Sequence, residues 1–239
     1  MTSTVLKIIA LATMVFDHVG AVFFPEVEWI RMVGRISFPL FAFLLVQGFV
    51  KTRSRPKYMV RLAVFALLSE VPYDLLFSRT YLNWHSQSIM LELFCGFCML
   101  QFVESAIQKK NPAWLLGAAA MAGAAQFLSA SYGLYGMALL LAFYLFRHYR
   151  GADALALLGL TYLFYGVTNF GVSVGDYHFM LLSKNTLQLF AMAASVPLVF
   201  YNGKKGRHSM KWLFYFVYPL HLLLLWVIRY FLEENRLPW

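Results

Sequence analysis

Apolar segments about as long as a lipid bilayer is thick recur along almost the whole chain. A transmembrane helix needs about 20 consecutive, mostly apolar residues. Hydrophobic residues make up 61% of the chain and charged residues 13%, whereas a soluble domain has about 45–50% and about 25%. The sequence predicts an all-α integral membrane bundle, one domain over residues 1–239, with about nine spans (roughly eight to ten). The expected spans are residues 4–25, 30–50, 58–77, 88–107, 113–129, 132–147, 153–172, 186–201 and 211–232.

The basic residues collect in short connections between the apolar segments. They fall near residues 51–57, 109–110, 147–150 and 204–211, in alternate connections, and the opposite connections hold few. Because cytoplasmic loops of membrane proteins are enriched in Lys and Arg, we expect a cytoplasmic N-terminus and a multi-pass protein of the bacterial cytoplasmic (inner) membrane. The net charge of +9 is then a signal of topology, and we expect no nucleic-acid partner.

Two ionisable residues, Asp17 and His18, stand side by side inside the first apolar segment. This pair, like Lys7 near the start of the segment, is not typical of a cleavable signal peptide. An Asp at the centre of a bilayer costs about 2.5–3.5 kcal/mol on insertion scales, so such residues usually have a function and a partner. We expect Arg35, in the next segment, to be that partner.

Polar residues of several segments lie at similar depth in the membrane. At a rise of about 1.5 Å per residue, His18 lies roughly 9–10 Å and Arg35 roughly 8 Å below the outer surface. Glu70 and Asp74 are spaced i, i+4 and share one helix face. We expect one polar cavity in the outer half of the membrane; the alternative is a set of structural ion pairs. Glu92 lies at a similar depth, and Tyr218 and His221 of the last segment lie at roughly mid-membrane.

The side chains around His18 suit acid–base chemistry. An imidazole titrates near neutral pH, and an adjacent carboxylate can orient it as a general base. Arg35, with Arg31 close by in the sequence, is suited to hold a phosphate or a developing oxyanion.

Two weaker motifs carry no prediction of a site. Cys95 and Cys98 have CxxC spacing, but both lie inside one apolar segment without a second pair, so we expect core cysteines. Asp176 and His178 are too few ligands for a metal site, and no metal is expected.

Five short motifs, taken in order, resemble the TraX family within the wider group of transmembrane acyltransferases. The motifs extend over almost the whole chain. They are Asp17-His18, GRISFPLFA at 34–42, SEVPYD at 69–74, SYG with Gly136 at 131–136, and YPLHL at 218–222.

The resemblance implies an acetyltransferase that uses cytoplasmic acetyl-CoA and an amine or hydroxyl acceptor reached from the outer face of the membrane. The plasmid-encoded member of the family is associated with N-terminal acetylation of pilin. In related acyltransferases a first-span histidine is essential and an arginine helps to hold the donor, which correspond by position to His18 and Arg35. The acceptor stays open among a protein N-terminus, a glycan and a small molecule.

On this reading His18 deprotonates the acceptor, and Asp17 or a neighbouring carboxylate such as Glu70 or Asp74 orients the imidazole. A second polar side chain donates to the thioester oxygen; Tyr218 and His221 are the candidates. Basic residues of the cytoplasmic connections attract the phosphates of CoA; the candidates are Arg53, Arg55, Lys57 and Arg61.

Two other classes of function stay open. The first is a small proton-coupled transporter that uses the same polar cavity, although the chain shows no internal repeats of the kind that many transporters have. The second is a structural subunit of an envelope complex, whose buried charges hold helices together.

Overall fold

A computed structural model describes residues 1–128, 130–167, 170–174, 177–182, 185–206 and 211–234. Most of these residues are helical, as predicted. Part of the expected basic connection at 204–211 lies outside the described residues. In chain order the elements are α1 (Ser3–Phe23), α2 (Glu28–Gly34), α3 (Ser37–Lys51), α4 (Arg55–Phe77), α5 (Ile89–Lys109), α6 (Trp114–Phe127), α7 (Gly133–Leu145), α8 (Ala152–Tyr165), β1 (Phe170–Val174), β2 (Tyr177–Leu182), α9 (Thr186–Leu189), the 3₁₀ helix η1 (Phe190–Ala194), α10 (Ser195–Val199) and α11 (Lys211–Glu234).

Large apolar side chains cover the outside of several helices. Leu67 of α4 is 74% exposed, Leu116 of α6 75% and Leu155 of α8 70%. Soluble monomers rarely expose extensive apolar patches, whereas a lipid environment favours them. These exposed faces and the long apolar helices support a membrane protein.

Four helical stretches in the described part of the chain are long and apolar enough to cross a membrane: Ser3–Phe23, Glu28–Lys51, Ile89–Lys109 and Tyr215–Glu233. Every predicted span contains a helix, but α6, α7 and α8 have only 13 or 14 residues. At about 1.5 Å per residue they reach roughly 20 Å, less than the ~30 Å hydrocarbon core. The count of nine spans is therefore not confirmed.

One short hairpin departs from the all-helical prediction. β1 and β2 pair antiparallel, with Val172 opposite Phe179 and Val174 opposite Tyr177. The span expected at 153–172 ends earlier as a helix, at Tyr165. β-branched and aromatic residues of this kind favour a strand over a helix.

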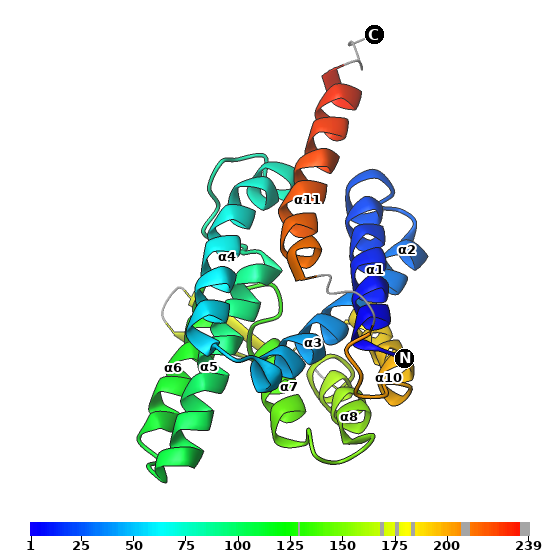
Figure 1. Ribbon diagram of the computed structural model, residues 1–239. Coiled ribbons are helices and arrows are strands. Elements are labelled where there is room, and N and C mark those ends of the chain that lie inside the picture. Colours follow the sequence, from blue (N-terminus) through cyan, green and yellow to red (C-terminus); the bar gives the residue numbers. More distant parts are fainter. Residues whose placement is uncertain (129, 168–169, 175–176, 183–184, 207–210, 235–239) are drawn as a thin grey trace.

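Helix α3 lies in the centre of the molecule, and every residue from Ser37 to Val46 is buried. Figure 1 shows α1 and α2 on one side, α4 and α5 on the other, and α11 rising toward the C-terminus in the gap. Helix α11 contacts both α4 and α1. This packing brings α11 against α1, the helix that carries Asp17 and His18.

Candidate functional site

His18 of α1 and His221 of α11 form a hydrogen-bonded pair. Nδ1 of His18 lies 2.6 Å from Nε2 of His221, and the ring planes differ by 2°. Nδ1 of His221 lies 2.7 Å from the carbonyl oxygen of Val217. A carbonyl can only accept, so Nδ1 of His221 carries a proton, and the Nε2 of a neutral His221 accepts from Nδ1 of His18. Nε2 of His18 then keeps its lone pair, as a general base requires.

Aromatic rings enclose this pair. The ring of His18 meets Phe77 edge-on at a centroid distance of 5.5 Å and Tyr218 at 6.3 Å. Tyr218 also meets His221 edge-on at 5.6 Å. His221 and Tyr218 are buried, whereas His18 is partly exposed. The structure thus brings together three of the predicted site residues.

Asp17 contacts two arginines, not His18. Nε of Arg31 donates to Oδ1 of Asp17 at 3.1 Å, and Nη2 of Arg35 donates to Oδ2. The absence of a side chain at Gly34 permits this approach, because a Cβ there would lie 2.2 Å from the Cβ of Asp17. Both carboxylate oxygens are engaged by the arginines, so His221 is the residue placed to orient His18.

Glu70 and Asp74 hold the connection between α4 and α5. Glu70 accepts from the hydroxyl of Ser88 at 2.6 Å and from its N–H at 3.1 Å. Asp74 accepts from the N–H of Asn83 at 2.7 Å. Neither carboxylate contacts the histidine pair. Glu70 thus supports the start of α5, and Asp74 supports the connection that precedes it.

We expect Glu70→Ala to lower the free energy of unfolding by about 1–3 kcal/mol, because the buried N–H and hydroxyl of Ser88 lose their acceptor. Thermal unfolding of the detergent-solubilised protein measures the change. Glu70→Gln retains an acceptor oxygen and should lose less. A Glu70→Ala protein with the wild-type midpoint would contradict this role.

Glu92 also has a structural contact. It is fully buried, and its Oε2 accepts from the N–H groups of Tyr132 and Gly133 at 3.3 and 3.0 Å. This contact fixes the SYG motif at the start of α7, so the motif holds a helix end.

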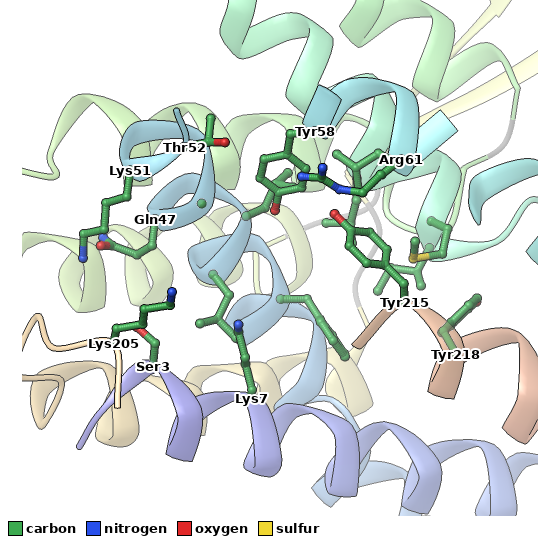
Figure 2. Close-up of a pocket in the computed structure, with 18 of the residues that line it drawn as sticks. Ser3, Lys7, Gln47, Lys51, Thr52, Tyr58, Arg61, Lys205, Tyr215 and Tyr218 are labelled. Atoms are coloured by element: carbon green, nitrogen blue, oxygen red, sulfur yellow. The ribbon is translucent and has the colours of Figure 1, made fainter. Parts of the chain in front are cut away.

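A cavity of about 440 Å³ is lined by residues of α1, α3, α4, α5 and α11, with Tyr218 of α11 among them. Figure 2 shows Lys51 and Lys205 at one end of this cavity and Tyr218 at the other. Apolar side chains such as Leu44 and Leu93 also line it. The cavity therefore joins a basic end to the ring that touches the histidine pair.

Four cationic residues line the cavity: Lys7, Lys51, Arg61 and Lys205. Arg61 is the one among them that we singled out as a candidate for binding the donor. Lys51 and Lys205 belong to the alternating basic connections, but membrane topology by itself explains that pattern. Nothing in the sequence indicated that Lys7 would line a binding site.

The other candidates for binding the donor do not line the cavity. Nη2 of Arg55 donates to Glu104 at 3.2 Å, and its guanidinium lies 4.3 Å from the ring of Phe49. Arg53 and Lys57 are exposed. Arg31 and Arg35 belong to the Asp17 cluster.

Hydrogen bonds from Lys51 and from the N-terminal segment fix the basic end of the cavity. Nζ of Lys51 donates to the carbonyl of Gly203 and to the hydroxyl of Tyr201, both at 3.2 Å. The N–H of Ser3 donates to the carbonyl of Lys204 at 2.9 Å. These bonds hold the connection before α11 over the cavity.

Within the described residues, the remaining motifs add no site. Cys95 is buried and Cys98 partly buried, and both are free thiols. Asp176 lies outside the described residues, as does the side chain of His178.

The comparisons with known proteins agree with the motifs. The family model for the TraX protein matches residues 2–229. A probable fimbrial assembly protein FimC of Dichelobacter nodosus is 28% identical over 95% of this chain and 96% of its own. The protein TraX of Escherichia coli is 30% identical over 64% of this chain and 60% of its own. No solved structure matches. The chain belongs to the TraX family.

Proposed function

We propose that this protein is an integral membrane acetyltransferase. It transfers an acetyl group from cytoplasmic acetyl-CoA to an amine or hydroxyl acceptor reached from the outer face of the membrane. The observation that carries the proposal is the cavity with a basic end, which extends to Tyr218 beside the His18–His221 pair. The fimbrial assembly named for one relative favours a surface protein as the acceptor.

The proposed topology has the N-terminus in the cytoplasm and about nine membrane segments in the bacterial inner membrane. The basic end of the cavity, with Lys51 and Lys205, then opens toward the cytoplasm, where acetyl-CoA is found. His18 lies further along α1, toward the outer face.

The residues of the cavity fit an acyl-CoA donor. Ammonium and guanidinium groups attract phosphates and form charge-assisted hydrogen bonds with them, which suits Lys7, Lys51, Lys205 and Arg61. The apolar part of the lining, which includes Leu44 and Leu93, suits the uncharged pantetheine arm. The donor supplies a thioester carbonyl and a thiolate leaving group.

In the proposed reaction, Nε2 of His18 takes the proton of the acceptor amine or hydroxyl as the acceptor attacks the carbonyl carbon. The hydroxyl of Tyr218 donates to the developing oxyanion. The C–S bond then breaks, and the imidazolium of His18 returns the proton to the CoA thiolate. His221 keeps Nδ1 of His18 hydrogen-bonded throughout, so Nε2 is the nitrogen that exchanges the proton.

We expect the double variant Lys51→Gln/Lys205→Gln to raise the Kd for acetyl-CoA about tenfold or more, because charge-assisted hydrogen bonds contribute about 1.5–3 kcal/mol each. Calorimetry on the detergent-purified protein measures the Kd. The matched control is Lys110→Asn, which removes a charge away from the cavity at a left-handed position that Asn tolerates. An unchanged Kd in the double variant, or no saturable binding by the wild type, would contradict the proposal.

A further inference from the structure

The guanidinium of Arg31 is only partly engaged. Its Nε donates to Asp17 at 3.1 Å. Its Nη1 and Nη2 make no hydrogen bond to the part of the chain that the structure describes. The side chain is 32% exposed, against 13% for Arg35. The free edge of Arg31 therefore remains open to a ligand.

The charges around Arg31 do not balance. Asp17 is the one carboxylate that pairs with both Arg31 and Arg35 in the described structure. Arg35 is more buried and also donates to Oε1 of Gln188 at 3.3 Å. One positive charge is left over, and a charge within a membrane is normally paired. Arg31 carries that excess at the accessible edge of the cluster.

Arg31 is also held in place. Its Cδ lies close to Gly20 of α1, where an added Cβ would be 3.5 Å away. With the stem against α1 and Nε fixed by Asp17, the two Nη groups form a preorganised fork. This planar fork matches the two oxygens of a carboxylate or a phosphate.

The fork is separate from the donor cavity, because Arg31 does not line it. Asp17, which holds the fork, directly precedes His18 in α1, so the fork and the histidine pair lie along the same stretch of this helix. A ligand bound to the fork would therefore lie outside the donor cavity, beside the stretch of α1 that carries His18.

We infer that the Nη edge of Arg31 binds an anionic group, a carboxylate or a phosphate, on the acceptor, a few bonds from the amine or hydroxyl that His18 deprotonates. The assignment of this anionic group to the acceptor rests on the proposed function, whereas the anion site itself rests on the geometry of Arg31. The site selects acceptors that carry a negative charge beside the reacting group.

Protection of His18 from diethylpyrocarbonate tests the inference without turnover. The detergent-purified protein is treated with and without O-phosphoethanolamine or β-alanine, and mass spectrometry follows the peptide that contains His18. Ethanolamine, at equal ionic strength, is the probe without an anionic group. We expect both anionic probes, and not ethanolamine, to protect His18. Arg31→Gln should raise the half-protecting concentration about tenfold or more. Arg31→Lys, which keeps the charge without the fork, should fall in between.

The variants distinguish the two anion sites. Protection that persists in Lys51→Gln/Lys205→Gln and is lost in Arg31→Gln supports the inference. The reverse pattern would place the anions in the donor cavity and overturn it. A His18 that is unreactive in the free protein, or that no anion protects, would also overturn it. Acetyl-CoA binding, measured on the same preparations, tests folding and the proposed function separately. A protein that binds the anions through Arg31 but does not bind acetyl-CoA would contradict the proposed function and leave the anion site intact.

Discussion

Replacing His18 with Gln is expected to reduce acetyl transfer by about 10²–10⁴-fold, the usual contribution of a general base. Gln occupies a similar volume but has no basic nitrogen in the place of Nε2. The measurement is the incorporation of radiolabelled acetyl groups from acetyl-CoA into acceptors of membrane vesicles that contain the protein. Acetyl-CoA binding should be retained, because His18 does not line the cavity.

His221 provides the control for the role of the pair. His221→Ala removes the acceptor for Nδ1 of His18 and should reduce transfer by about 10²-fold, because a misplaced catalytic group costs that much. His221→Gln can still accept through its side-chain oxygen and should retain more activity. Equal losses in both variants would contradict a positioning role for His221.

The same His18 variant separates the three classes of function. Loss of transfer with unchanged folding would support the acetyltransferase, whereas unchanged transfer would contradict the role of His18 as its general base. Loss of proton coupling with intact ligand binding would favour a transporter, and failure to assemble would favour a structural subunit.

The helices of this fold could be predicted from the sequence more completely than their membrane crossings. Hydrophobicity places a helix in every expected span, but it does not determine where each helix stops. Gly151, at φ 78°, sets the start of α8. The helix ends at Tyr165 and therefore has only 14 residues. Such local ends decide whether an apolar segment can cross the membrane.

The partners of the polar residues depended on helix faces that depth alone does not reveal. Asp17 and His18 are at the same depth, but neighbouring residues of a helix point about 100° apart. Asp17 therefore faces α2, and His18 faces α11. The histidine pair joins residues separated by 203 positions, so only the packing of α11 against α1 creates it. The alternative reading of a structural ion pair describes Arg35 with Asp17.

The second large effect is expected at Asp17, where Asp17→Ala should lower the free energy of unfolding by about 3–5 kcal/mol. The change leaves Arg35, whose side chain is 13% exposed, as an uncompensated buried charge. Arg31 is more exposed and contributes less. Thermal or denaturant unfolding in detergent measures the loss, and Asp17→Asn, which keeps the shape without the charge, should be nearly as unstable.

A second change tests whether the loss comes from the buried charge or from packing. Adding Arg35→Gln to Asp17→Asn removes the cation that was left unpaired, so the double variant should be more stable than Asp17→Asn alone. Residues that share an ion pair show such coupling, of about 0.5–3 kcal/mol, in double-mutant cycles. Purely additive losses would contradict a charge pair. Because His18→Gln leaves this pair intact, a stable but inactive His18 variant beside an unstable Asp17 variant would assign chemistry to one residue and assembly to its neighbour.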